Sequence, residues 1–149
     1  MSLDLGPALR TAMVSDVNIF TNLGQWNGNP SVFTRRPVPG DANYPMIVVN
    51  PDVFLTDEDF INAKNPIVSK DIAVYGQQST NPQQDQYRVV EDLGYSVREL
   101  FHRNKHSITP PTGYSVLDIV ATGPIAAPTD DEKFVGRVVN LTIRLHKEN

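Results

Sequence analysis

The stretch QQDQYRVVEDLGYSVRELFHRN (residues 83–104) decides the fold, because its apolar residues recur at the spacing of a helix. With a turn every 3.6 residues or so, such a pattern gives one apolar stripe and one charged face. The stripe holds Tyr87, Val90, Leu93, Gly94, Val97, Leu100 and Phe101, and the other side holds Arg88, Glu91, Asp92, Arg98, Glu99 and Arg103. A helix of ~20 residues is about 30 Å long, enough to cover a whole sheet.

Two residues of this helix stand out from the pattern. Gly94 lies inside the apolar stripe, where glycine costs roughly 1 kcal/mol relative to alanine. We therefore expect a strand or the first helix to approach it closely. Tyr95 lies off the stripe, on the polar face, and is a candidate for contact with another molecule.

Two strands are predicted before the long helix. Residues 44–50 (YPMIVVN) form a continuous apolar run, which is typical of a strand covered on both faces. Residues 52–55 extend it past Pro51 only as an edge or a bend, since proline cannot donate to a ladder. Residues 56–66 (TDEDFINAKNP) are acidic and polar and read as a loop, and residues 67–76 (IVSKDIAVYG) read as the second strand.

Two further strands follow the helix, over residues 113–123 and 134–146. The second alternates apolar and polar side chains clearly and exceeds the usual five or six residues, so that it could extend past its own sheet. Before residue 44, Asp4 and Ser15-Asp16 offer caps for a first helix and for a shorter one carrying Val17, Phe20 and Leu23. Residues 24–45, rich in glycine and proline, predict a loop with one short strand at 31–35.

The order of elements predicts an α+β fold for residues 1–149, taken as a single domain. We expect a mainly antiparallel or mixed sheet of about four strands. The N-terminal helix and the long helix would pack on it, with long loops between the elements.

Composition excludes several kinds of chemistry. The chain has 149 residues, no cysteine and a net charge of −4. Disulfides, zinc–thiolate sites and thiol nucleophiles are therefore excluded. The net negative charge is the opposite of the basic surface that binds nucleic acid. Arg35-Arg36 is the one basic doublet of the proline-rich loop. No signal peptide or membrane-spanning stretch is visible, so we expect no membrane partner.

The stretch VYGQQSTNPQQDQYR (residues 74–88) joins a strand to the long helix, a place where many folds bind phosphate. A phosphate loop needs several glycines, usually with a lysine or a serine/threonine at the helix start. This stretch has one glycine and no lysine, and Pro82 removes an amide. It is predicted to be a plain connection.

No residue set points to catalysis or to a metal. His102 and His106 are four apart, but they lie near the end of the helix and lack the glutamate of a metallopeptidase pair. The carboxylates at 57–59 and 130–132 lie in predicted loops without the glycine spacing of a calcium site. We therefore predict no catalytic residues, no metal ligands and no cofactor, and a protein that is not an enzyme.

What remains is surface. Aromatic and aliphatic residues near the acidic stretch and on the polar helix face are typical of subunit contacts. The predicted interface residues are Phe54, Leu55, Phe60, Ile61 and Tyr95.

The succession of elements also resembles a known family. The segments are ALRTAMVSD (8–16), YPMIVV (44–49), IAVYG (72–76) and VVEDLGYSVRELF (89–101), followed by a final pair of strands with a long connection. This order is similar to that of the tail-completion, or tail-terminator, proteins that join head and tail in long-tailed bacteriophages and prophage-like elements. The resemblance covers nearly the whole chain.

The resemblance implies a structural role in a virion assembled in the host cytoplasm. Such proteins form a ring, usually a hexamer, that caps the tail tube, ends its polymerisation and presents a surface to the head-side connector. DNA passes through the lumen without sequence-specific binding, and the family has no catalytic residues to transfer. Two alternatives stay open. One is another neck or minor tail component, such as a head-closure or adaptor protein. The other is a small α+β enzyme or ligand-binding module, in which Tyr75, Tyr87 and the histidines would line a pocket.

Overall fold

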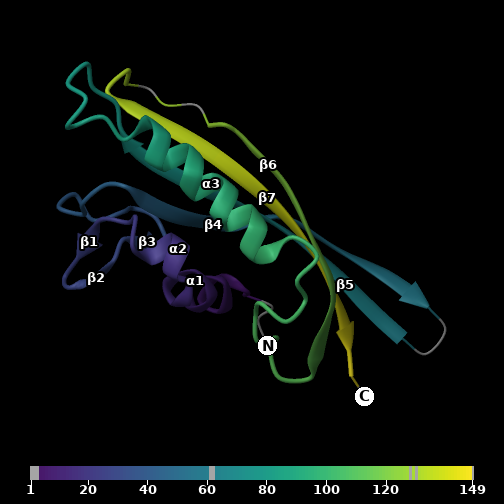
Figure 1. Cartoon of the computed structure of the whole chain (residues 1–149). Coiled ribbons are helices and arrows are strands. Elements are labelled where there is room, and N and C mark those ends of the chain that lie inside the picture. The colour runs from purple at the N-terminus through teal and green to yellow at the C-terminus, as the bar shows by residue number, and fades with distance from the viewer. Residues whose placement is uncertain (1–3, 61–62, 128, 130, 149) are drawn as a thin grey trace.

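The computed structural model describes residues 4–60, 63–127, 129 and 131–148, with side chains described outside residues 51–64. Within this part of the chain, one sheet has the strand order β3-β4-β5-β7-β6 (Figure 1). Its strands are β3 (Val32–Phe33), β4 (Met46–Phe60), β5 (Ala63–Gln77), β6 (Tyr114–Ala126) and β7 (Phe134–Lys147). The four long strands are those expected from the sequence, and the predicted α+β class is confirmed.

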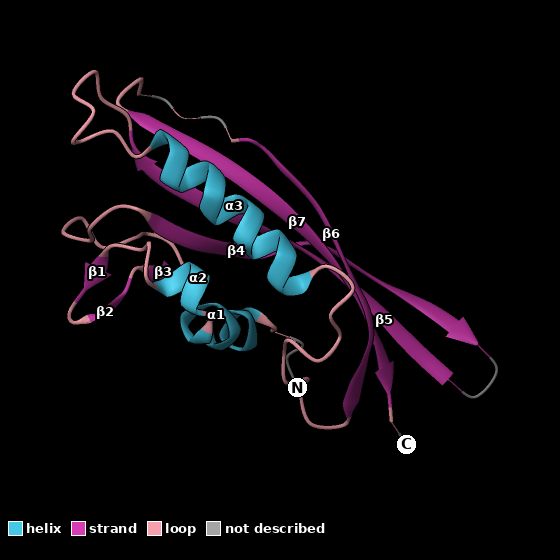
Figure 2. Ribbon diagram, in the orientation of Figure 1, coloured by secondary structure: helices cyan, strands magenta, loops and turns pink. Residues whose placement is uncertain are grey.

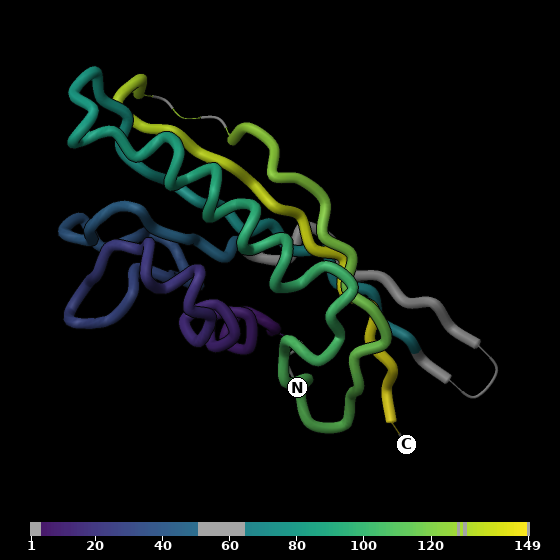
Figure 3. Tube along the Cα trace, in the orientation of Figure 1, coloured from purple at the N-terminus to yellow at the C-terminus, as the bar shows by residue number. Residues whose placement is uncertain are grey.

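The sheet is mixed because of its shortest strand. β4, β5, β7 and β6 pair antiparallel with their neighbours, whereas β3 runs parallel to β4 through Val32 and Phe33. β7, the last strand in the chain, lies between β5 and β6, as the yellow trace in Figure 3 shows. β7 pairs with β5 from Phe134 to Arg144 and with β6 from Arg137 to Lys147, so it has a strand partner along its whole length and does not extend past the sheet as its length suggested.

Three helices, α1 (Gly6–Ser15), α2 (Val17–Phe20) and α3 (Tyr87–Phe101), lie on one face of the sheet (Figure 2). Asp16 is the N-cap of α2 as predicted, and its Oδ1 accepts a hydrogen bond of 2.9 Å from the Asn18 amide. The N-cap position of α1 is Leu5 and not the predicted Asp4, although Asp4 Oδ1 accepts a hydrogen bond of 2.9 Å from the Gly6 amide. α2 is only one turn long, and its buried residue is Ile19. Of the predicted apolar set, Val17 and Phe20 are exposed, whereas Leu23, which follows the helix, packs against the core.

α3 is shorter at both ends than the pattern predicted. Before it, Asn81 organises a turn, accepting through its carbonyl from Gln84 and through its side chain from Gln83. After Phe101, His102 is extended, and Arg103 has a φ of 55°, in the left-handed region that stops a helix. Polar residues at both ends fit either helix or turn, which is why periodicity alone placed the ends too far out.

The core lies between α3 and the sheet. The stripe residues Val90, Leu93, Val97 and Phe101 are buried, as predicted from their spacing. Gly94 admits β6, because a Cβ there would lie 2.9 Å from Cβ of Pro124. Gly76 of β5 likewise admits α3, since a Cβ at this position would lie 2.4 Å from Cγ2 of Val90. Because glycine has no side chain, these two positions let α3 approach the sheet closely.

A second, smaller cluster covers the other face of β4. Ala42, Met46 and Val48 are buried there against Trp26, Phe33, Val38, Tyr44 and Tyr75. The predicted coverage of residues 46–49 on both faces is therefore confirmed. The loop also contains a small hairpin, β1 (Gln25–Trp26) with β2 (Asn29–Pro30), which the sequence analysis missed. Its turn residues Asn27 and Gly28 have φ of 51° and 78°.

Of residues 56–66, predicted to be a loop, the described ones instead continue the hairpin of β4 and β5. Backbone pairing runs from Thr56 opposite Ile67 to Phe60 opposite Ala63. β5 pairs with β7 only from Ile67 onward, so this part, here called the hairpin arm (residues 56–60 and 63–66), is a two-stranded ribbon beyond the sheet. Sequence patterns detect burial of one face, and a ribbon without a third strand leaves no such pattern.

Candidate interaction surfaces

The hairpin arm is the first candidate surface. Of the predicted interface residues, Phe60 belongs to it and pairs in register with Ala63. Phe54 and Leu55 lie just before it on β4, opposite Ser69 and Val68 of β5. Ile61 lies outside the described residues. The irregular register between Val49 and Phe54, around Pro51, agrees with the bend predicted there.

The outer face of α3 is a second, separate surface. Tyr95 is 56% exposed, whereas Leu93 is 1% exposed, so the two faces of the helix are assigned as the sequence predicted. Tyr95 lies on the helix layer, and the arm extends past the end of that layer (Figure 1). The structure therefore does not gather the predicted interface residues into one patch.

Among the residues whose side chains are described, five other large apolar side chains are exposed, and none of them was predicted as a contact. They are Val17 and Phe20 on α2, Tyr87 at the start of α3, which the helical pattern had placed in the apolar stripe, and Leu117 and Ile125 on β6. Leu117 lies at an irregularity in the register between β6 and β7, and Ile125 follows another. Because a bulge redirects side chains, simple alternation along a strand cannot predict such positions.

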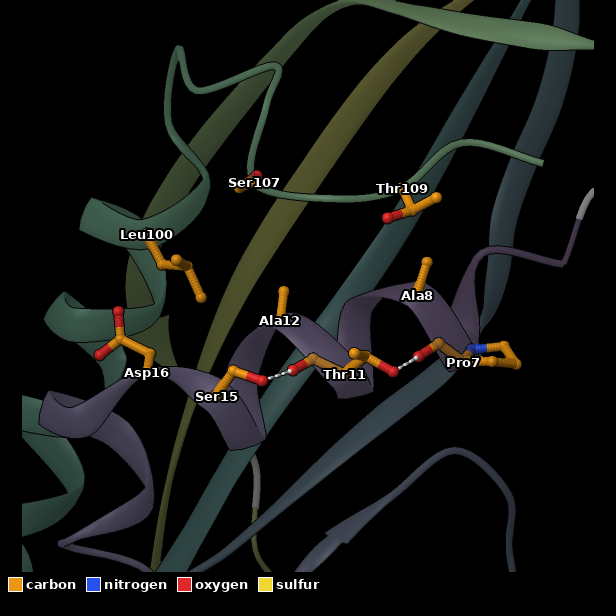
Figure 4. Close-up of a pocket in the computed structure, with 9 residues that line it drawn as sticks. All are labelled: Pro7, Ala8, Thr11, Ala12, Ser15, Asp16, Leu100, Ser107 and Thr109. Carbon is orange, nitrogen blue, oxygen red and sulfur yellow. Dashed lines mark hydrogen bonds between the residues drawn. The ribbon is translucent and has the colours of Figure 1, made fainter. Parts of the chain in front are cut away.

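A groove of about 600 Å³ runs between α1 and the segment that follows α3 (Figure 4). Ala8, Ala12 and Leu100 give it an apolar floor, and Thr11, Ser15, Ser107 and Thr109 give it hydroxyls. The hydroxyls of Thr11 and Ser15 are already used within α1, because they donate to the carbonyls of Pro7 and Thr11. The groove has no set of polar groups converging on one point.

The tyrosines and histidines named for the alternative of an enzyme or ligand-binding module do not come together. Tyr75 lines a groove of about 440 Å³ among the loops, with Tyr44 and Phe134. Tyr87 lies on α3 on the other face of the sheet, where its hydroxyl accepts a hydrogen bond of 2.9 Å from Arg137. His146 lies beside Asn65, with 2.8 Å between Nδ1 and Oδ1, and His102 contacts β6. The pocket expected under that alternative is therefore wrong.

At the connection between β5 and α3, backbone amides donate hydrogen bonds to side chains of the same connection. Gln77 N donates to the side chain of Gln86 over 2.9 Å, and Ser79 N donates to Asp85 over 3.2 Å. Within the described residues, no group of three His, Asp or Glu side chains is placed to hold a metal ion. Asp130, of the second acidic cluster, lies outside the described residues. None of the helices described has the length and hydropathy needed to cross a membrane.

One solved structure shares this architecture over nearly its full extent. It is described as the virion of native gene transfer agent (GTA) particle, and one of its chains matches with a TM-score of 0.69 and 13% sequence identity. The match covers 97% of this chain and 95% of that chain. No protein-family model matches the sequence. No curated protein matches it either. The likeness thus lies in the fold.

Proposed function

We propose that this chain is a structural virion protein of a phage or phage-like particle, with no catalytic role. The observation that carries the proposal is the match, at a TM-score of 0.69 and over nearly the whole of both chains, to a chain of a GTA virion. The dispersed histidines and tyrosines and the internally bonded loop amides agree with it, because these groups do not converge on one site among the described residues. Within the virion, we assign the chain to the end of the tail.

In this role the chain forms a ring, a hexamer by the family resemblance, that caps the tail tube and joins it to the head-side connector. In a ring, each subunit contacts its two neighbours through two different surfaces. Such heterologous contacts form a closed ring when the rotation that relates neighbouring subunits returns to the first one. The hairpin arm and the outer face of α3 are two such unlike surfaces. Phe54, Leu55, Phe60 and Ile61 would serve one contact and Tyr95 another.

DNA passes through the lumen of this ring without sequence-specific binding. The net charge of −4 suits such a channel, because strong attraction to phosphate would hold the duplex in place. The partners are further copies of the chain, the tail tube protein and the connector. The protein belongs at the head–tail junction of the virion.

The experiment adds the purified protein to polymerising tail tubes of the same particle and measures tube length by electron microscopy. We expect tubes to stop growing and to carry a ring of density at one end. Tubes of unchanged length without end-bound density contradict the capping role. Density on isolated head connectors instead would assign the chain to the neck as a head-closure or adaptor protein.

A shortened arm tests how the cap binds. Replacing residues 59–64 with Asn-Gly keeps Glu58 opposite Asn65, leaves the contact of Asn65 with His146 in place and closes the hairpin with a favoured two-residue turn. The thermal midpoint should change little, because Asp59 and Phe60 pair with Lys64 and Ala63, which are removed with them, whereas capping should be lost. The control replaces Lys105, an exposed residue of the loop after α3, with alanine. Normal tube length with the short arm would refute the arm contact and leave the capping proposal intact.

A further inference from the structure

The outer edge of β6 is closed by the end of α3. In an edge strand every second residue directs its amide and carbonyl away from the sheet. On β6, the amide of Ala121 donates to Nδ1 of His102 over 3.1 Å. The carbonyl of Ile119 accepts from the Arg103 amide over 2.7 Å. A helix end thus occupies positions that another strand would otherwise take.

Side chains close the neighbouring positions on the same edge. The amide of Ile119 donates to Oδ1 of Asp118 over 2.9 Å, and the carbonyl of Gly123 accepts from Arg98 over 3.3 Å. Asp118 also forms an ion pair with Arg103, which ties the helix end to the strand. Four outward groups over residues 119–123 are therefore satisfied within one copy of the chain.

The backbone of Arg103 is bent to make this contact. Its φ of 55° lies in the left-handed region, which is uncommon for a residue with a long side chain. Such a conformation persists only where surrounding contacts impose it, and here the Ile119 carbonyl and the Asp118 carboxylate do so. Arg103, the residue with this strained backbone, is therefore the one that covers the edge of β6.

We propose that His102 and Arg103, here called the edge guard, prevent β6 from pairing with β6 of a second copy. β6 is 13 residues long, and long unpaired edges recruit strands from other chains. Antiparallel pairing of two copies centred on Ala121 would bring the end of β6 that carries Leu117 beside the end of the other copy that carries Ile125, and each of these ends contains one irregularity in its register with β7. Both side chains are exposed, at 49% and 64%, and would lie near each other in that pairing. The inference is independent of the tail-end role.

The test opens the edge with the variant His102→Ala/Asp118→Ala. Removing both acceptors frees the amides of Ala121 and Ile119 without changing the pairing of β6 with β7. We expect faster hydrogen exchange at Ala121. We also expect self-association beyond that of the unmodified chain, with a dissociation constant lower by about tenfold or more in sedimentation, which corresponds to roughly 1.4 kcal/mol. The control, His106→Ala, removes an exposed histidine of the same loop and should change neither measurement.

Cysteines added to the opened variant identify the contact. The chain has no cysteine of its own, so a disulfide formed by the variant Leu117→Cys/Ile125→Cys must join the introduced cysteines. These positions are too far apart along one strand for a disulfide within a copy, whereas the proposed pairing brings them together between copies. Disulfide-linked dimers are expected only in the opened variant.

Two results would contradict the proposed role of the edge guard. One is a variant His102→Ala/Asp118→Ala whose Ala121 amide exchanges faster but whose mass in sedimentation is unchanged and which forms no cross-link. The other is unchanged exchange at Ala121. Association without the 117–125 cross-link would equally refute the proposed pairing. If the double variant fails to fold, His102→Ala alone is measured in the same way.

Discussion

Replacing Leu93 with alanine is expected to lower the free energy of unfolding by about 2–5 kcal/mol, as for other buried leucines. Leu93 is 1% exposed and lies in the middle of the stripe that α3 packs on the sheet. The loss should appear as a lower midpoint in denaturant at unchanged slope, because the same surface is exposed on unfolding.

Tyr95→Ala is the matched control on the same helix. Its side chain is 56% exposed, so the change in the free energy of unfolding should stay within about 0.5 kcal/mol. Its effect should instead appear as weaker assembly into rings on tail tubes. Equal destabilisation by the two substitutions would show that the faces of α3 are assigned wrongly.

Gly76→Ala is expected to cost about 1–3 kcal/mol, as overpacking of a filled core does. The added Cβ would lie 2.4 Å from Cγ2 of Val90, so α3 must move away from β5 or Val90 must shift. Gly40→Ala is the control, since a Cβ there meets nothing within 4 Å.

A double-mutant cycle makes this prediction specific. Val90→Ala alone leaves a void and should also destabilise the protein. Combined with Gly76→Ala, it removes the clash, so the double variant should be more stable than the sum of the two losses by about 0.5–3 kcal/mol. Strictly additive losses would mean that Gly76 is needed for some reason other than the approach of α3.

The parts of the fold that the sequence predicts are those where burial is sustained along an element. The stripe of α3 and the alternation in β7 were located from their periods, and β4 was located from a continuous apolar run because both of its faces are covered. The hairpin at Asn27-Gly28 was missed although this dipeptide is the commonest signal for a two-residue turn. The hairpin arm could not be found in that way, because no helix or third strand gives its residues a periodic pattern.

The candidate surfaces were harder to predict, for a different physical reason. Tyr95 was recognised as exposed because a helix face can be calculated from spacing alone. Leu117 and Ile125 lie near irregularities in the register of β6, where alternation fails. His102 was considered from the sequence as a metal ligand, whereas its Nδ1 accepts from the amide of Ala121, and that partner lies nineteen positions away. Long-range pairing of this kind is set by the tertiary structure.

The position of β7 has a consequence for how the chain is made. Since β7 is inserted between β5 and β6, those two strands have no shared neighbour until the C-terminal segment has left the ribosome. Nascent chains ending before residue 134 would expose the edges of β5 and β6 that β7 covers, the kind of species that chaperones bind and that aggregates when concentrated. Completion of the sheet therefore depends on β7, and the sheet should close only after synthesis has passed this strand.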